Sequence, residues 1–563
     1  MKRFQPILIV FFLIVSCQTQ HVRETDTSKV YDNAAVITAH PLASKVGVDI
    51  LKKGGNAIDA AIAVKFALAV VYPNAGNIGG GGFLVYRSKD GEKAALDFRE
   101  KAPSLADKDM YLDSAGNPIT RLSLDGHLAA GVPGTVAGMQ EAHKKYGTLT
   151  WAELLAPAIE LANNGFNITK RQATEFNSYQ KRFKQYSTSS ASIIRDQPWK
   201  KGDVFIQSQL GNTLNLIAEN GRDGFYKGPV ADDIVAEMKR GNGLISHEDL
   251  ENYQAVWRKP IVGNYKNYTI ISMPPSSSGG TALLALLQSV ESYPLSQWGF
   301  QSDSTIRVMV EAERRIYADR ATHLGDPDFY NVPTEFLTNK RLNQERMAKV
   351  NLEKATPSSE VNAAQFPGYE SEETTHYSIV DKDGNAVSLT TTLNGSYGSG
   401  VWVDGAGFLL NNEMDDFSVK PGSPNIYGLL GGKANSIQPG KRMLSAMTPT
   451  IVEQDGKLKM AIGTPGGSTI ITSVFQGILN VLEFGMSAQE SVSAPRFHHQ
   501  WQPDRIDVET GAISDDVRKS LKEDGYSINK RGAIGRMENI IIMPNGKRQA
   551  GADPRGDDTA NGY

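Results

Sequence analysis

The stretch Glu373-Thr374-Thr375-His376-Tyr377-Ser378-Ile379-Val380 joins a polar segment, residues 357–373, to a β-hairpin. Residues 377–381 have the alternation of a strand, and residues 382–385 contain the Asp-Gly pair of a tight turn. Residues 386–393 then return as a strand rich in β-branched side chains. The stretch therefore predicts a strand that begins where a polar segment meets the protein core.

Thr374 stands at this boundary, where cleavage after Glu373 would make it a new N-terminus. An N-terminal threonine carries a hydroxyl nucleophile and an α-amine that can act as its base. The ordinary pKa of such an amine is about 7.7–8.0, so part of it is unprotonated near neutral pH. The alternative interpretation is that Thr374 only starts a strand, and the rest of the chain has to decide between the two.

Length and composition describe a globular protein. The 563 residues, 40% hydrophobic and 21% charged, suffice for a large core in one large or two closely joined domains. The net charge of -3 and the lack of a basic block argue against a nucleic-acid partner. We expect no metal site and no cofactor, because His498 and His499 are adjacent and the H-E-x-x-H pattern is absent.

Residues 1–17 have the pattern of an export signal, with a basic start and an apolar run, residues 7–15, that is too short to span a bilayer. The end of this segment, Ile14-Val15-Ser16-Cys17, resembles the bacterial lipobox, in which the cysteine is lipidated. Residues 18–30 would then form a flexible tether. The sequence predicts a periplasmic lipoprotein anchored through Cys17; the alternative is cleavage nearby and a soluble periplasmic protein.

Two glycine-containing segments shape the first part of the chain. Residues 41–71 predict two helices, the second capped by Asn56 and buried because it is apolar nearly all round. The run Gly79-Gly80-Gly81-Gly82 lacks the lysine of a phosphate loop and indicates a close backbone approach within the core. A hairpin over residues 83–98 follows, and Arg99 leaves its end either toward a pocket or onto the surface.

Residues 150–350 predict mainly helices, and the charged run 311–320 is interpreted as a salt-bridged helix surface. The serine-rich loop 273–280 contains no G-x-S-x-G nucleophile motif. Residues 411–416 place three carboxylates at a strand end, which indicates either a solvated turn or a cation site. Gly466 and Gly467 lie between a predicted strand and helix, where backbone N–H groups can form an oxyanion hole or another anion site.

Several motifs together resemble the bacterial γ-glutamyltranspeptidase (glutathione hydrolase) family of N-terminal-nucleophile hydrolases, from about residue 30 to Tyr563. They are Thr374-Thr375-His376-Tyr377, Asn411-Asn412-Glu413-Met414-Asp415-Asp416-Phe417-Ser418, Pro465-Gly466-Gly467-Ser468, Ala494-Pro495-Arg496-Phe497-His498-His499-Gln500-Trp501 and Asp553-Pro554-Arg555. The resemblance implies an α+β fold, a four-layer αββα sandwich. It also implies self-cleavage into a large subunit, residues 31–373, and a small catalytic subunit, residues 374–563, which remain together as a heterodimer.

The same resemblance implies a role for each matching residue. Thr374 would be the nucleophile, first on Glu373 and then on substrate, and Thr392 would orient it. The α-carboxylate of the substrate would meet Arg99 and Ser445, and the α-ammonium would meet Asn394, Glu413 and Asp416. The remaining assignments are Gly466 and Gly467 as oxyanion donors and Tyr427 in a lid loop.

The implied activity is transfer of a γ-glutamyl group from glutathione or another γ-glutamyl compound, through an ester on the nucleophile, to water or to an acceptor amino acid or peptide. One departure is Ala446, because many family members have a second serine after the position of Ser445. That departure leaves open a cephalosporin or glutaryl acylase of the same fold. A third interpretation is a processed but inactive lipoprotein that binds amino acids or peptides.

Overall fold

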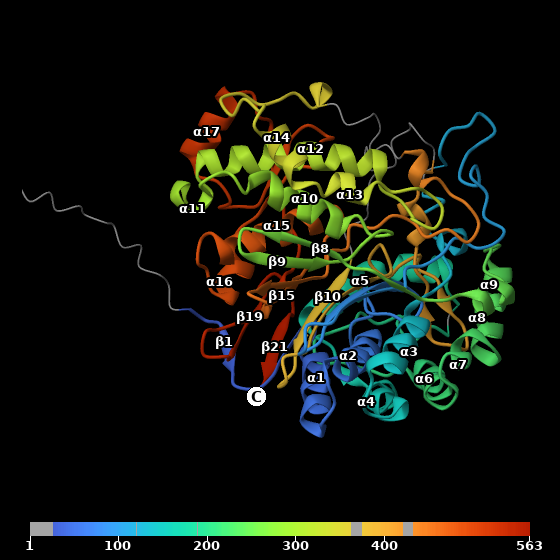
Figure 1. Ribbon diagram of the computed structural model, residues 1–563. Coiled ribbons are helices and arrows are strands. Elements are labelled where there is room, and N and C mark those ends of the chain that lie inside the picture. The colour runs from blue at the N-terminus through green and yellow to red at the C-terminus, as the bar shows by residue number, and fades with distance from the viewer. Residues whose placement is uncertain (1–25, 120, 189, 362–373, 420–431) are drawn as a thin grey trace, which may run out of the picture.

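The computed structural model describes residues 26–119, 121–188, 190–361, 374–419 and 432–563. Two seven-stranded sheets lie face to face in the middle of the molecule, and helices cover both outer faces (Figure 1). The predicted four-layer αββα sandwich is thereby confirmed. Three residues of interest, Cys17, Glu373 and Tyr427, lie outside the described residues.

The first sheet contains the predicted hairpin at its centre. Its strands, in spatial order, are β21 (Thr559–Gly562), β2 (Ala35–Thr38), β10 (Thr375–Val380), β11 (Ala386–Thr392), β3 (Gly81–Arg87), β4 (Lys93–Asp97) and β7 (Val256–Arg258). All neighbouring pairs are antiparallel. Every residue of β10 and β11 is buried, because the second sheet covers one face and helices cover the other.

The second sheet is also antiparallel. Its strands, in spatial order, are β1 (Lys29–Tyr31), β20 (Arg548–Ala552), β19 (Glu538–Ile542), β15 (Lys457–Gly463), β14 (Thr450–Gln454), β9 (Tyr268–Ser272) and β8 (Ile261–Tyr265). The sequence-based prediction of a mainly helical region over residues 150–350 missed β7, β8 and β9. These strands have three to five residues each, too few to show a clear period, and they complete the edges of sheets formed by distant segments.

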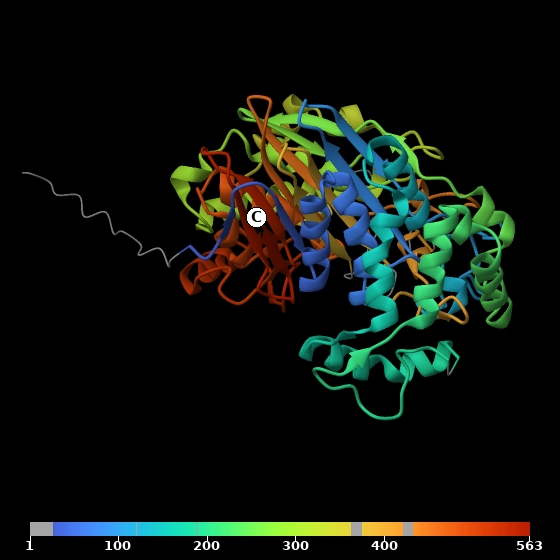
Figure 2. The same ribbon diagram turned by 90° about the horizontal axis from the view of Figure 1, so that it is seen from below.

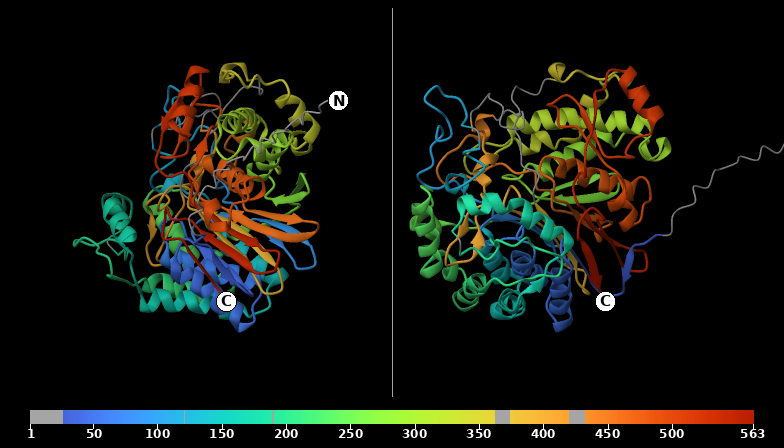
Figure 3. Two further views of the ribbon diagram at one scale, coloured as in Figure 1. Left: turned by 90° about the vertical axis from the view of Figure 1, so that its left-hand side faces the viewer. Right: turned by 180° about the vertical axis from the view of Figure 1, so that it is seen from behind.

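Helices from the first part of the chain cover the first sheet. They are α1 (Pro41–Lys53), α2 (Ala57–Val71), α3 (Thr135–Tyr146), α4 (Trp151–Asn164), α5 (Lys170–Tyr186), α6 (Ser208–Asn220), α7 (Asp223–Tyr226), α8 (Pro229–Arg240) and α9 (His247–Asn252). α1, α2 and α3 contact the sheet directly. Seen from below and from the side, α5 and the residues after it stand out from the body of this layer (Figures 2 and 3).

The opposite helical layer covers the second sheet. It contains α10 (Gly279–Val290), α11 (Leu295–Trp298), α12 (Asp303–His323), α13 (Thr334–Leu337), α14 (Lys340–Met347), α15 (Thr469–Leu482), α16 (Ala488–Ser493) and α17 (Asp515–Glu523). Short strands outside the two sheets are β5 (Phe166–Asn167), β6 (Val204–Phe205), β12 (Trp402–Val403), β13 (Phe408–Leu409), β16 (Phe497–His498), β17 (Ile506–Val508) and β18 (Ile528–Lys530). In the described part of the chain, no helix combines the length and apolar character needed to cross a membrane.

The start of α2 confirms the predicted helix cap. The Asn56 side chain accepts hydrogen bonds from the N–H groups of Ile58 (2.9 Å) and Asp59 (3.0 Å), and Asp59 accepts one in return from the Asn56 N–H. This reciprocal arrangement satisfies N–H groups that the first helical turn leaves unpaired. Every residue of α2 is buried, as its apolar sequence predicts.

The sequence predicts that the charged run on α12 lies on the protein surface, and this prediction is wrong. Glu311, Glu313 and Arg314 are all buried. Arg314 donates to the Ser358 hydroxyl (2.6 Å), and Glu313 accepts from the His499 N–H (2.9 Å). Segments distant in sequence therefore cover this face of α12 and satisfy its charges internally, which the local charge pattern cannot reveal.

Candidate active site

The predicted nucleophile lies at one end of the first sheet. Thr374 immediately precedes β10 and is only 5% exposed. In the strand register Thr375 is opposite Thr391, so the next pair places Thr374 opposite Thr392. Thr392 is in turn paired with Gly81 of β3. Thr374, Thr392 and Gly81 therefore lie at the same end of three neighbouring strands.

Arg99 belongs to the same end of the sheet. Phe98, just beyond β4, exchanges backbone hydrogen bonds with Gly82 of β3, at 3.0 and 3.3 Å. Arg99 follows and is 1% exposed, so it is a buried arginine and not a surface one. β4 lies three strands from β10, a separation of roughly 14 Å between strand axes that the long arginine side chain partly bridges.

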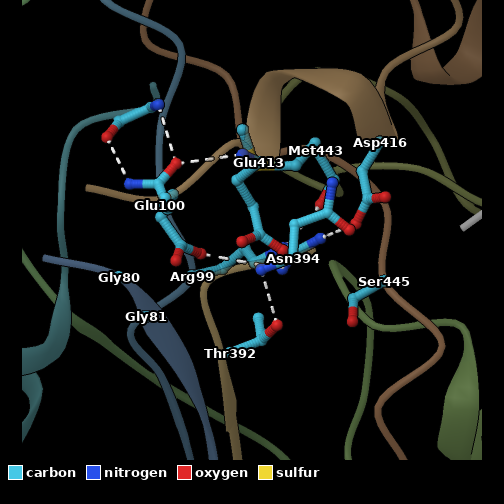
Figure 4. A network of polar contacts seen from close by, with 12 residues as sticks. Gly80, Gly81, Arg99, Glu100, Thr392, Asn394, Glu413, Asp416, Met443 and Ser445 are labelled. Atoms are coloured by element: carbon cyan, nitrogen blue, oxygen red, sulfur yellow. Dashed lines mark hydrogen bonds and ion pairs between the residues drawn. The ribbon is translucent and has the colours of Figure 1, made fainter. Parts of the chain in front are cut away.

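The Arg99 guanidinium is held between two carboxylates (Figure 4). One terminal nitrogen donates to Glu413 and the other to Asp416, and these acids lie on a single 3₁₀ turn, Glu413–Asp416. The guanidinium also donates to the carbonyls of Met443 (3.3 Å) and Leu444 (3.2 Å). Residues 411–416 are thus not a solvated turn, because the three acids are buried, Arg99 pairs with Glu413 and Asp416, and Asp415 accepts from the Ser123 hydroxyl.

Burial makes this acidic turn sensitive to a positive ligand. Desolvation raises the pKa of Glu413 well above its ordinary value, Arg99 opposes that rise, and the neighbouring Glu100 and Asp416 add to it. An ammonium placed beside Glu413 would favour its ionised form. A carboxylate and an ammonium on one small molecule could therefore replace the contacts that Arg99 and the acids make with each other.

Thr392 and Asn394 connect the end of β11, opposite Thr374, to the acidic turn. The Thr392 hydroxyl accepts a hydrogen bond from the Asn394 N–H (2.7 Å). The Asn394 amide donates to the carbonyl of Asn412 (2.9 Å), the residue before the turn. Asn394 has a left-handed backbone, φ 71°, a conformation that asparagine tolerates better than most residues.

Ser445 lies next to the carbonyls that bind Arg99 (Figure 4). The serine-rich loop holds it in place: the Ser278 N–H and hydroxyl both donate to the Ser445 carbonyl, at 2.7 and 2.6 Å, and the Ser445 N–H donates to the Ser276 carbonyl (3.2 Å). The serine-rich loop, which lacks a nucleophile motif, thus holds the backbone of Ser445 in place. Ala446, the departure from the family pattern, is fully buried in the apolar core.

The Gly466-Gly467 loop joins β15 to α15. Both glycines have positive φ, 135° and 56°, which residues with a Cβ rarely adopt. The Thr469 hydroxyl donates to the Gly466 carbonyl (2.7 Å), and the Tyr317 hydroxyl donates to the Ser468 carbonyl. Protein hydroxyls thus bind the carbonyls of this loop. In such an arrangement its backbone N–H groups can donate hydrogen bonds to a ligand.

His376 connects this loop to the nucleophile across the two sheets. A Cβ added at Gly463, the last residue of β15, would lie 2.2 Å from the His376 ring, so the ring and that backbone are in close contact. The ring is fully buried and hydrogen-bonds the hydroxyls of Thr390 (2.9 Å) and Ser378 (3.0 Å). This contact brings the start of β10, where Thr374 lies, next to the end of β15, which leads into Gly466.

We expect Gly466→Ala to lower kcat strongly. The added Cβ would lie 2.6 Å from the Thr469 hydroxyl and 3.2 Å from the Gly535 Cα, on a backbone of φ 135°. Alanine keeps the backbone N–H, but this conflict should move the loop so that the N–H no longer points at the oxyanion. Losing one oxyanion donor typically costs about 2.7–4 kcal/mol of transition-state stabilisation, so kcat should fall roughly 100- to 1,000-fold. Gly485→Ala is the matched control, because Gly485 has φ 65° with open space around its Cβ position. Equal kinetics for the two variants would exclude the proposed role of Gly466.

Two residues that shape the site, Asn411 and Gln500, were not identified from the sequence. Asn411 donates to the carbonyls of Gly79 (2.9 Å) and Gly131 (2.8 Å) and accepts from the N–H groups of Gly131 (2.8 Å) and Glu413 (3.0 Å). It thereby fixes the start of the acidic turn. Gln500 accepts from the Ser468 hydroxyl (2.8 Å), beside the glycine loop. Both residues lie inside motifs that the sequence singles out, but nothing local distinguishes them from their neighbours.

Comparisons with known proteins agree with this geometry. Residues 43–563 match the family model for gamma-glutamyltranspeptidase. A glutathione hydrolase proenzyme of Escherichia coli is 48% identical, over 94% of this chain and 91% of that protein. The Helicobacter pylori gamma-glutamyltranspeptidase structure is 49% identical with a TM-score of 0.57, covering 57% of this chain and 93% of the solved chain.

A solved cephalosporin acylase from Bacillus halodurans has the same overall fold. Its TM-score is 0.84 at 26% identity, with 98% of this chain and 99% of that chain covered. Family membership follows from the sequence matches, which extend over nearly all of the chain. The chain belongs to the γ-glutamyltranspeptidase family.

Proposed function

We propose that this chain is a self-processing γ-glutamyl hydrolase and transferase that acts on glutathione and other γ-glutamyl compounds. The observation that carries the proposal is the buried Arg99, held by Glu413 and Asp416 at the same end of the sheet as Thr374. A free amino-acid end carries one carboxylate and one ammonium, and this site offers a counterpart to each. The family match and the proenzyme relative support the same activity.

Processing precedes turnover in this proposal. The Thr374 hydroxyl attacks the carbonyl of Glu373, the peptide nitrogen leaves as the new α-amine, and an ester joins the two residues. Water hydrolyses that ester and releases two subunits, residues 31–373 and 374–563. Each sheet contains strands of both pieces, and neighbouring strands from the two pieces pair with each other, which would keep the subunits together after cleavage.

In turnover the same hydroxyl attacks the γ-amide carbonyl of the substrate while the Thr374 α-amine takes its proton. Gly466 and Gly467 donate N–H groups to the developing oxyanion. Departure of the amine leaves a γ-glutamyl ester on Thr374. Water or an acceptor amino acid or peptide then attacks the ester, which regenerates the enzyme. No step requires a metal or a cofactor.

Substrate recognition in this proposal depends on fixed charges. The guanidinium of Arg99 and the hydroxyl of Ser445 bind the α-carboxylate of the substrate. Its α-ammonium is bound by Glu413, Asp416 and Asn394. An arginine fork suits a carboxylate better than a lysine does, because it donates two parallel hydrogen bonds. Tyr427 would close over the bound substrate as part of a lid loop.

We expect γ-glutamyl-p-nitroanilide to be cleaved faster than glutaryl-p-nitroanilide. The two compounds share the terminal carboxylate and differ in the α-ammonium, so their ratio measures the contribution of the acidic turn. A hydrogen bond to a charged group is worth about 1.5–3 kcal/mol. The kcat/KM for the γ-glutamyl compound should therefore exceed that for the glutaryl compound roughly 10- to 150-fold. Faster release from the glutaryl compound would favour the second candidate, an acylase like the structurally similar cephalosporin acylase.

We further propose that the protein is exported to the periplasm and anchored by a lipid on Cys17. The basic start, short apolar run and lipobox-like sequence at residues 1–17 support this location. Mass measurement of the N-terminal fragment from a membrane fraction tests it. A fragment that begins at Cys17 and carries acyl mass is expected, whereas an unmodified soluble fragment would contradict the anchor.

A further inference from the structure

Lys65 is an unusual residue for its place in the fold. It lies in the middle of α2, whose residues are all buried, and its own side chain has no exposed surface. Its ammonium donates to the carbonyl (2.7 Å) and to the side-chain oxygen (3.2 Å) of Asn77. A buried charge is unfavourable unless it is paired, and an apolar side chain of similar volume is often at least as stable. Packing of α2 alone does not explain a lysine here.

Asn77 connects Lys65 to the end of β11. The Asn77 amide donates to the carbonyl of Thr392 (2.8 Å) and to the hydroxyl of Thr391 (3.3 Å). Its side-chain oxygen, which faces Lys65, also accepts from the Gly80 N–H (3.1 Å). A Cβ on Gly80 would lie 2.2 Å from the Thr392 carbonyl oxygen, so the same carbonyl is enclosed from a second side. The ammonium thus holds Asn77, mainly at its backbone carbonyl, together with the Thr135 hydroxyl, which donates to the side-chain oxygen (2.8 Å), and Asn77 in turn holds Thr392.

Glu100, a buried acid next to Arg99 (Figure 4), interacts electrostatically with Lys65. One Glu100 oxygen lies 3.6 Å from an Arg99 nitrogen, and within the described residues the Glu100 carboxylate accepts no hydrogen bond. Burial raises the pKa of Glu100 to about 7, with Asp416 adding to the rise and Arg99 and Lys65 opposing it. Burial lowers the pKa of Lys65 well below its ordinary value, and Glu100 opposes that change. The two groups thus stabilise each other's charged forms.

We propose that Lys65 is a positioning residue for the glutamyl site, acting on Thr392 through Asn77 and on Arg99 through Glu100. This inference rests on the proposed function. Arg99 donates to Glu413 and Asp416. When a substrate ammonium takes those two acids, an ionised Glu100 continues to hold the guanidinium from behind while its fork receives the substrate carboxylate.

Two substitutions separate the two effects of Lys65. Lys65→Met removes both the hydrogen bonds to Asn77 and the charge, whereas Lys65→Gln can still donate to Asn77 and removes only the charge. Loss of the charge makes ionisation of Glu100 less favourable, so its pKa rises. When kcat/KM for γ-glutamyl-p-nitroanilide is plotted against pH, its fall toward acidic pH is the acid limb. In both variants the acid limb should move to higher pH by about one unit. Only Lys65→Met should also lower the pH-independent kcat.

Glu100→Gln supplies the test of the coupling. This substitution should remove the contribution of Glu100 to the acid limb and leave that of the Thr374 α-amine, and adding Lys65→Gln to it should then change the profile little, because the charge on Lys65 has lost its partner. Phe66→Leu is the matched control: Phe66 is equally buried on α2, so its loss should lower Tm without moving the limb. Each variant is compared as processed, folded enzyme at equal subunit concentration.

Additive effects of Lys65→Gln and Glu100→Gln, with an unmoved acid limb in Lys65→Gln, would overturn the inference and leave Lys65 as a core residue only. If Lys65→Met does not fold, the Lys65→Gln and Glu100→Gln pair still decides the question. An inactive wild-type enzyme would instead contradict the proposed function, so the two failures are distinguishable.

Discussion

Thr374→Ala is expected to remain one uncut chain with no measurable turnover. The substitution removes the hydroxyl that attacks Glu373, and without cleavage no α-amine forms to serve as base. Loss of a catalytic nucleophile typically costs a factor of about 10⁴ or more in kcat. Denaturing electrophoresis measures the cleavage, and release of p-nitroaniline from γ-glutamyl-p-nitroanilide measures the activity.

Two controls make this result specific. Thr374→Ser keeps a hydroxyl at the same atom position and should still be cleaved. Thr375→Val tests the neighbouring residue, which is fully buried and whose hydroxyl has no hydrogen-bond partner among the described residues. It should be cleaved and active. If Thr374→Ala divided into two subunits, the nucleophile would have to be another residue.

Arg99→Lys is expected to lower kcat/KM by roughly 10- to 150-fold, mainly through KM. Lysine keeps the positive charge but replaces a rigid two-pronged donor with a single point charge, so one charged hydrogen bond to the substrate carboxylate is lost. Such a bond is worth about 1.5–3 kcal/mol. Lysine also cannot bind Glu413 and Asp416 together as the two ends of the guanidinium do. Steady-state kinetics on purified, processed enzyme measure the change.

Arg87→Lys is the matched control for this substitution. Arg87 is also buried and paired with a carboxylate, Glu453, at 2.7 Å, but it lies at the opposite end of β3 from Gly81. The control should lose some stability and keep its KM. An Arg99→Lys enzyme with the kinetics of the Arg87→Lys enzyme would show that Arg99 does not bind the substrate.

The central hairpin could be predicted from the sequence because its signals are local. Alternation, the Asp-Gly turn and the β-branched return strand gave β10 and β11 to within a residue or two. The cap at Asn56 and a close backbone approach at the glycine run likewise follow from residue type, although the partner of Gly80, Thr392, could not be read from the sequence. The resemblance to a known family then supplied the four-layer fold and the set of site residues.

Other features depend on distant segments and could not be predicted in this way. A carboxylate cluster such as residues 413–416 looks the same in sequence whether water or Arg99, more than 300 positions away, neutralises it. The charged face of α12 resembles a surface until residues 352–358 and 499–504 cover it. Lys65 interrupts an apolar run in the sequence, but only the structure shows that Asn77 is its hydrogen-bond partner.

The central claim is that the polypeptide cuts itself so that one threonine supplies both the nucleophile and the base. Mass measurement of the purified wild-type protein under denaturing conditions tests it most directly. We predict two polypeptides, the smaller beginning at Thr374 and ending at Tyr563. A single uncut polypeptide that still cleaves γ-glutamyl-p-nitroanilide at full rate would contradict the account.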